Sequence, residues 1–250
     1  MNWSKIKTIM ICFLFAMNVF MISFIGFSIF RDHSVPDEVV EASLRLLKKD
    51  GFECKKETLP NLTYKLPTLN TQFYSESELS EIFFSVQMAF KTTQNSLVAS
   101  GPDGTLTVSE NYFLFENGNT ADTSASSGKI KKALKKAGID MSNSVYDEKE
   151  RCFYYMYNGV NLFNMYLKAE LDQDGNLCYV SALWPGKISP QKDTSLSFSS
   201  SVKKVKTAFP QGGKIELIEP GYSLIPMGGN RYIFQPSWRV KVGEELKILE

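Results

Sequence analysis

The sequence has few of the residues on which most catalytic and metal sites depend. Its 250 residues include one histidine and four cysteines. A single imidazole argues against catalytic triads and histidine-rich zinc sites, which need an oriented base or several ligands. The formal net charge is only +1, whereas nucleic-acid-binding domains usually carry a clear basic excess. The composition therefore favours neither metal-dependent catalysis nor nucleic-acid binding.

Apolar residues are abundant enough to form a packed core. Hydrophobic residues make up 43% of the chain and aromatic residues 13%, which disfavours intrinsic disorder. The 16 glycines and 10 prolines are ordinary numbers for this length, which excludes collagen-like and proline-rich low-complexity chains. We expect folded domains over most of the sequence.

A long apolar segment lies near the N-terminus. No charged residue occurs from Ile9 to Phe30. As a helix this segment would extend roughly 33 Å, compared with a hydrocarbon core of about 30 Å. A cleaved signal peptide is the alternative, but its apolar region is usually about 7–15 residues and ends in a small-residue cleavage site. Because Phe27-Ser28-Ile29-Phe30 offers no such site, we expect an uncleaved signal anchor.

The flanking charges predict the orientation of this anchor. Lys5 and Lys7 precede it, and basic residues next to a short tail favour the cytoplasmic side. Residues 1–8 are then a cytoplasmic tail, residues 9–30 the transmembrane signal anchor, and the C-terminal domain is extracytoplasmic. Since no second long apolar run follows, we expect a single-pass protein of the cell membrane.

Asn18 is the one strongly polar side chain within the predicted span. Two interpretations stay open, because a buried amide in lipid either bonds its own helix or bonds a neighbouring helix. In the second interpretation Ala16, Ser23 and Gly26 would allow close approach, which makes these four residues a possible transmembrane helix-contact face.

The extracytoplasmic part alternates between helix-like and strand-like patterns, which predicts an α+β fold. A polar stretch, Asn117–Ser127, separates two such series. We therefore expect two tandem helix-plus-antiparallel-sheet subdomains, residues 35–122 and 123–250. The expected helices begin near Asp37 and cover Ser77–Thr92, Lys129–Ala137 and Ser199–Phe209, and the clearest strands are Thr105–Phe115, Arg151–Asn158, Val160–Leu171 and Asn176–Trp184.

No catalytic, cofactor or metal site is predicted. His33 directly follows the apolar segment, and neither a C-x-x-C nor an HExxH motif is present. Asp147, Glu148 and Glu150 are the clustered acids that a wall hydrolase would need, and we interpret them as solvated loop charges. A disulfide between Cys152 and Cys178 would require adjacent strands, and buried free thiols are the alternative.

Two further polar features have simple structural explanations. Asp172-x-Asp174-x-Asn176 resembles a calcium loop but has glycine at its fourth rather than its sixth position, so we interpret it as a hairpin loop. The lysines of Lys129–Lys136 are typical of a solvated helix surface. An acidic partner or an anionic wall polymer is the alternative for these lysines.

Four segments carry a resemblance to a known family. They are Asn2–Ile9 at the start, Asn18-Val19-Phe20 in the predicted anchor, Glu57-Thr58-Leu59-Pro60, and Ile233–Val240 near the end. With these segments the chain resembles the YycI/YycH family of Gram-positive bacteria, closest to YycI.

The resemblance implies a non-enzymatic regulator of a two-component system. Proteins of that family associate through transmembrane helices with the WalK (YycG) sensor histidine kinase and with a YycH-like paralogous membrane protein, and thereby tune cell-wall homeostasis. Their extracytoplasmic region is α+β and distantly PepSY-like, and no cofactor is implied. The alternative is an anchored extracytoplasmic module that binds a peptide or wall fragment or acts as a chaperone.

Overall fold

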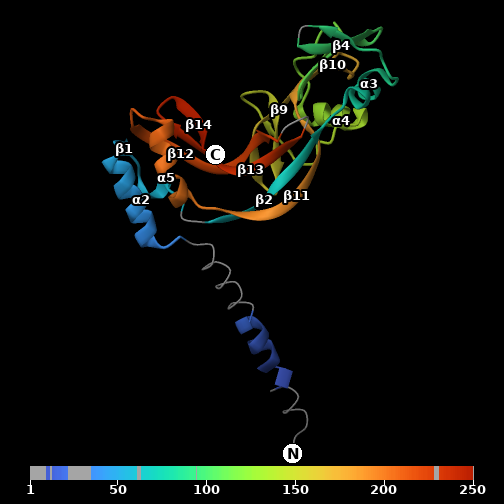
Figure 1. The fold of residues 1–250 in the computed structure, drawn as a ribbon. Coiled ribbons are helices and arrows are strands. Elements are labelled where there is room, and N and C mark those ends of the chain that lie inside the picture. Colours follow the sequence, from blue (N-terminus) through green and yellow to red (C-terminus); the bar gives the residue numbers. More distant parts are fainter. Residues whose placement is uncertain are drawn as a thin grey trace, which may run out of the picture. The chain divides into compact units, whose positions relative to one another are not determined.

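The computed structural model describes residues 10–11, 13–21, 35–60, 63–93, 95–227 and 231–249 (Figure 1). The chain divides into two compact units that interleave in sequence. Unit 1 comprises Met1–Lys65, Ser195–Ile218 and Val240–Lys247, and unit 2 comprises Leu66–Thr194, Glu219–Arg239 and Ile248–Glu250.

The fold is α+β, as the alternating sequence pattern predicts, but one large sheet dominates it in place of two tandem sheets. The helices are α2 (Asp37–Lys49), the 3-10 helix η1 (Lys56–Thr58), α3 (Glu76–Phe84), α4 (Ser127–Ala137) and α5 (Phe198–Ala208). The strands are β1 (Phe52–Glu53), β2 (Tyr64–Phe73), β3 (Lys91–Thr93), β4 (Ser96–Gly101), β5 (Gly104–Ser109), β6 (Tyr112–Glu116), β7 (Ser144–Asp147), β8 (Cys152–Tyr157), β9 (Val160–Leu171), β10 (Leu177–Leu183), β11 (Pro185–Leu196), β12 (Gly213–Pro226), β13 (Tyr232–Val242) and β14 (Glu245–Leu249).

The sheet has the strand order β11-β2-β13-β12-β9-β10-β6-β5-β4-β3. Most neighbouring strands with a defined register are antiparallel, whereas β12 runs parallel to β9 with Gly221 opposite Asn161. β6 pairs with β10, so that Phe113 lies opposite Ala182 and Phe115 opposite Val180. This pairing joins segments more than sixty residues apart in sequence.

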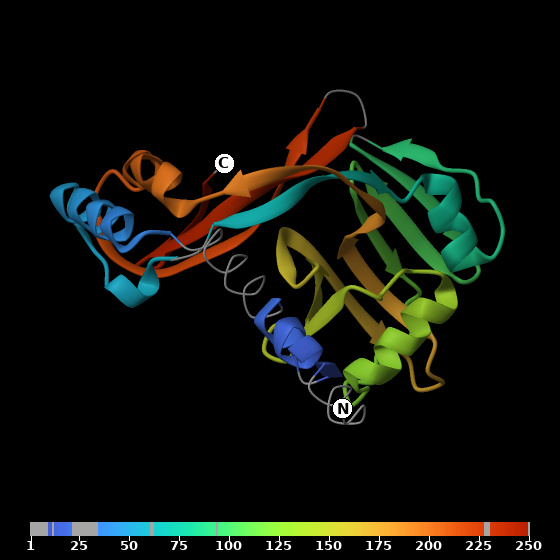
Figure 2. The ribbon, with the colours of Figure 1, turned by 90° about the horizontal axis from the view of Figure 1, so that it is seen from below.

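Unit 1 packs two helices against each other. α2 and α5 lie side by side (Figure 2), and Lys206 of α5 forms an ion pair of 2.8 Å with Asp50 at the end of α2. Leu47 and Val205 are fully buried, which agrees with the apolar stripe of each amphipathic helix. Gly213 donates its backbone N–H to the Gly51 carbonyl, where the short strand β1 pairs with β12.

Unit 2 holds the larger core. Trp184 and Trp238 are completely buried, and the indole Nε1–H of Trp184 donates to the Asp140 carbonyl at 3.1 Å. α4 contacts β9 and β10 and buries Ile130 and Leu134. These two positions, four residues apart, form one narrow apolar face of the helix.

α3 is shorter than the predicted helix over Ser77–Thr92. It begins with a capping box in which Ser75 and Glu78 bond reciprocally, and it ends before Ser85, which has a left-handed backbone with φ of 57°. The buried Ser80 hydroxyl donates to the Val86 carbonyl at 2.9 Å and accepts from the Met88 N–H at 2.7 Å. These bonds turn the chain away from the helix axis although the apolar spacing continues.

The predicted boundary between residues 122 and 123 is wrong. β6 lies before this boundary and β10 after it, yet they are neighbours in one sheet of unit 2. The polar stretch is a connection between two parts of this unit, and Ala121 within it forms a β-bridge with Asp172. A composition change cannot distinguish a linker from such a connection, because both are polar and surface-bound.

The Gly221–Phe163 contact supplies a test of the core of unit 2. A Cβ added at Gly221 would overlap the Phe163 ring, whereas one at Gly128 in α4 would meet nothing within 4 Å. Gly221→Ala should lower the free energy of unfolding by about 1–3 kcal/mol through overpacking. Gly128→Ala should leave it unchanged or raise it slightly.

Chemical denaturation followed by tryptophan fluorescence measures both variants, because Trp184 and Trp238 are buried in unit 2. Equal midpoints for the two variants would contradict the close approach of Phe163 to the Gly221 backbone.

Candidate functional site

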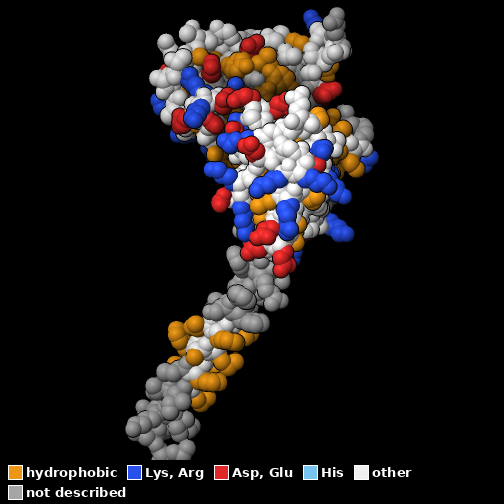
Figure 3. All heavy atoms as spheres, turned by 90° about the vertical axis from the view of Figure 1, so that its left-hand side faces the viewer, with side chains coloured by type: hydrophobic (Ala, Val, Ile, Leu, Met, Phe, Trp, Pro, Cys, Tyr) orange, Lys and Arg blue, Asp and Glu red, His pale blue; other side chains and the backbone are white. Residues whose placement is uncertain are grey.

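Part of the predicted anchor is described and is helical. Residues 10–11 and 13–21 have helical backbone with exposed side chains, and hydrophobic groups cover much of the face of this helix that Figure 3 shows. Phe15 is 69% exposed and Phe20 68%. Within the residues that the structure describes, no helix has both the length and the apolarity needed to cross a membrane.

Two of the four predicted helix-contact residues lie on the described helix. Ala16 and Asn18 are exposed on it, whereas Ser23 and Gly26 lie outside the described residues. The Asn18 amide donates from Nδ2 to the Leu14 carbonyl at 2.8 Å. This bond uses one of the two amide hydrogens and does not involve the side-chain oxygen. Asn18 therefore bonds its own helix, as the first of the two interpretations proposed.

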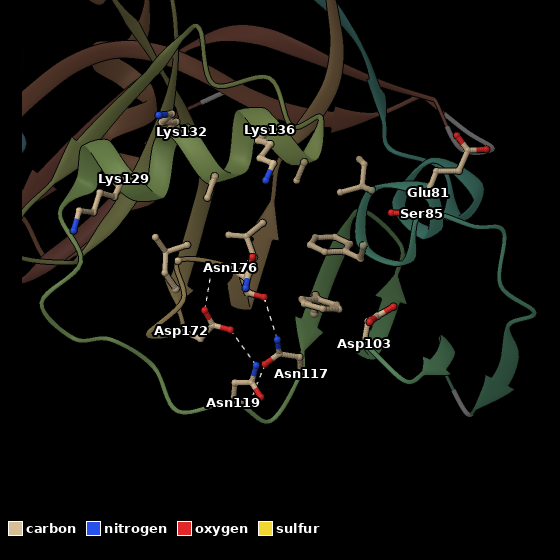
Figure 4. A pocket seen from close by; sticks show the side chains of 18 of the residues that line it. Glu81, Ser85, Asp103, Asn117, Asn119, Lys129, Lys132, Lys136, Asp172 and Asn176 are labelled. Atoms are coloured by element: carbon tan, nitrogen blue, oxygen red, sulfur yellow. Dashed lines mark hydrogen bonds between the residues drawn. The ribbon is translucent and has the colours of Figure 1, made fainter.

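A second candidate site is a pocket within unit 2, which the sequence did not predict. It has a volume of about 1010 Å³ and is lined by residues of α3, α4, β6, the β4–β5 turn and the β9–β10 loop (Figure 4). Pockets for small molecules usually measure about 300–1,000 Å³. This pocket therefore has room for an organic ligand rather than a single ion.

One wall of the pocket is basic. Lys129, Lys132 and Lys136 of α4 line it, since residues three or four apart share one face of a helix. All three side chains are exposed, and no ion pair holds them within the described part of the chain. In Figure 4 the Lys136 ammonium group points down from the helix into the pocket.

The β9–β10 loop is held by one carboxylate. Asp172 accepts hydrogen bonds from the backbone N–H of Asn176 at 2.9 Å and of Asp174 at 3.0 Å, and from the Asn119 side-chain amide at 3.0 Å. These bonds, with that from the Asn176 N–H contributing most, lower the pKa of Asp172. A carboxylate stabilised in its charged form by its own loop is a structural group rather than a proton donor.

Opposite the basic helix, the pocket has an aromatic surface and two acids. The Phe83 ring of α3 stacks on the Phe115 ring of β6, with centroids 4.4 Å apart and planes at 13°. Asp103 and Glu81 also line the pocket. Asp103 sits in the β4–β5 turn before Gly104, whose φ is 142° and where a Cβ would lie 2.5 Å from the Glu116 carbonyl oxygen. The sterically fixed turn sets the position of Asp103.

The Asp172–Asn176 loop and the lysines of α4, for which the sequence suggests purely structural roles, both line this pocket. The hairpin interpretation of Asp172–Asn176 is confirmed, because the segment joins β9 to β10. The lysines of α4 are exposed as predicted except Lys131, which is half-buried and donates from Nζ to the Ser144 carbonyl. Their placement on opposite sides of one pocket follows from the packing of α4 on β9 and β10, which neither motif reveals by itself.

The remaining candidates do not form a reactive site in the described residues. Asp147 accepts from the backbone N–H of Lys149 at 2.8 Å and of Glu150 at 3.1 Å, so it builds a turn. Groups of three or more potential metal ligands are absent from the described ranges, and His33 lies outside them. Cys152 on β8 and Cys178 on β10 are free thiols, and β9 separates their strands.

No protein-family model and no curated protein sequence matches the chain. Among solved structures, an uncharacterized protein from Eubacterium rectale is similar with 11% identity and a TM-score of 0.41, over 79% of this chain and 85% of that one. The C-terminal domain of Bacillus megaterium YpeB is similar with 13% identity and a TM-score of 0.29, over 72% of this chain and 99% of that domain. Likenesses at this level say nothing about what this chain binds or does.

Asp172 generates a testable pH dependence. Its lowered pKa means that the folded state gains stability above the ordinary aspartate pKa of about 3.9 and loses it as pH falls through the folded-state pKa. Asp172→Asn should therefore destabilise the protein at pH 7 by about 1 kcal/mol, the scale of a lost hydrogen bond. The difference from wild type should shrink at pH 3.

Asp174→Asn is the matched control, because the bond from residue 174 to Asp172 comes from its backbone N–H. Denaturation midpoints at both pH values measure the effect. A deficit of Asp172→Asn that is as large at pH 3 as at pH 7 would refute the assignment.

Proposed function

We propose that the protein is a membrane-anchored extracytoplasmic regulator of a sensor histidine kinase of the WalK type. The observation that carries the proposal is the N-terminal helix, whose described residues expose large apolar side chains, many of them on the face seen in Figure 3. A helix that is apolar all round is suited to lipid or to the interior of a helix bundle. The resemblance to the YycI/YycH family supports the kinase and a YycH-like protein as partners.

The proposed mechanism is lateral association of helices in the membrane. The N-terminus lies in the cytoplasm, the helix crosses once, and the folded units lie outside. Ala16 allows close approach, and Asn18 offers its remaining amide hydrogen and its oxygen to a neighbouring helix. Association that is stronger with one state of the kinase than with the other shifts the equilibrium between them.

Exchange of residues 1–31 for an unrelated single-span anchor tests this mechanism. The exchange should abolish kinase regulation, measured with a reporter of the response regulator, while the protein stays in the membrane. Asn18→Leu should reduce regulation partly, because it removes the polar contact, whereas Met17→Leu should not. Unchanged reporter output from the exchanged protein would refute the mechanism.

The pocket of unit 2 favours a second candidate function, an anchored extracytoplasmic binding module. Its volume is at the upper end of the range for ligand pockets, and it offers charged, amide and aromatic groups to a ligand. In this function the membrane helix serves only to hold the protein at the cell surface, and the pocket carries the activity.

Filling the pocket separates the two functions. Ala133 of α4 lines the pocket, whereas Lys135 on the same helix does not. If the binding module is the function, Ala133→Phe should abolish activity in cells and Lys135→Phe should preserve it, and exchange of residues 1–31 should be tolerated. Full activity of Ala133→Phe would exclude the pocket as the functional site.

A further inference from the structure

The pocket of unit 2 carries opposite charges on opposite sides. Lys136 points into it from α4, and Asp103 lies across from that helix on the β4–β5 turn (Figure 4). Neither side chain forms an ion pair within the described residues. Asp172, a third charge at the pocket, already accepts three hydrogen bonds and keeps about one of its four acceptor positions. One cationic and one anionic side therefore remain available to a ligand.

Apolar and amide groups lie between the two charged sides. The half-buried Phe83 ring, which stacks on the buried Phe115 ring, presents an apolar surface. Asn117 donates one amide hydrogen to the Leu177 carbonyl and accepts from the Asn119 N–H, which leaves its second amide hydrogen for a ligand carbonyl. A ligand that matches the pocket thus combines two opposite charges, an apolar group and hydrogen-bonding amides.

The acids of the pocket argue against a polyanion. The lysines of α4 alone would suit an anionic wall polymer, but Asp103 and Glu81 line the same pocket and would repel it. An uncharged glycan would leave both charged sides unused. The volume of about 1010 Å³ is too large to select a single amino acid.

We propose that this pocket binds a short peptide with free termini. The peptide carboxylate lies at Lys136, its ammonium group at Asp103, and an apolar side chain between them packs against the Phe83 ring. The proposal rests on the second candidate function, since it names the ligand class of that binding site. It does not depend on how the N-terminal helix acts.

The test uses the full-length protein in detergent micelles and affinity selection with mass spectrometry. Three probe mixtures are compared: synthetic tri- to hexapeptides with free termini, the same peptides acetylated and amidated, and a peptide-free glycan digest of cell wall. We expect retention of free peptides with apolar central residues, and at least about tenfold weaker retention of the blocked peptides. Equal retention of blocked and free peptides, or retention of the glycans alone, would overturn the proposal.

Charge variants locate the binding within the protein. Lys136→Glu and Asp103→Lys should each weaken retention of a selected free peptide about tenfold, as expected for reversal of one partly exposed ion pair. Lys135→Glu is the control, because Lys135 is exposed on the same helix and does not line the pocket. Equal effects of Lys135→Glu and Lys136→Glu would place the peptide elsewhere.

The outcomes separate this inference from the proposed function. Retention of glycans that Ala133→Phe abolishes would leave the pocket a binding site and remove the peptide assignment. No retention of any mixture would count against both.

Discussion

The pairing of β6 with β10 is the constraint on which the rest of unit 2 depends. It joins Tyr112–Glu116 to Leu177–Leu183 in an antiparallel register and so connects the meander β3–β6 to the strands β8–β10. α3 packs on the first part through Phe83 and Phe115, and α4 contacts the second through β9 and β10. The pocket lies where both helices and both parts meet, and without this pairing its walls would belong to separate structures.

The energetics of the pocket are divided between groups that build it and groups that remain free. Asp172 accepts hydrogen bonds from two backbone N–H groups of the loop that contains it. The turn that carries Asp103 is fixed by the backbone geometry of Gly104. The lysines of α4 are left without ion-pair partners among the described residues. Charged side chains on a well-ordered backbone lose little conformational entropy when a ligand binds. This low entropy loss is the physical basis of preorganised binding.

Local features of the fold could be predicted from the sequence because they depend on neighbouring residues. The third predicted helix, Lys129–Ala137, is confirmed as α4, since a stripe of Ile130 and Leu134 and a terminal glycine suffice to define it. The hairpin at Asp172–Asn176 is confirmed for the same reason. The predicted end of α3 is wrong, because the Ser80 hydroxyl, and not the apolar spacing, decides where the chain turns.

Long-range features could not be predicted in the same way. The polar stretch after β6 has the composition of a linker, but the pairing of β6 with β10 makes it a connection within one unit. The pocket was missed because the lysines of α4 and the turn at Asp103 are ordinary surface residues in the sequence. Only the sheet register brings them together. The predicted anchor differs in this respect, because the apolar run from Ile9 to Phe30 predicts it without reference to any distant residue.

Hydrogen–deuterium exchange of the full-length protein tests the central claim, that the pocket organised by β6–β10 pairing is a ligand-binding site. Addition of the free-peptide mixture should slow exchange together in residues 101–104, 127–137 and 171–177, which surround the pocket. Slowed exchange confined to the edge strands β3 or β11 would instead indicate strand addition at the sheet edge and would contradict the account.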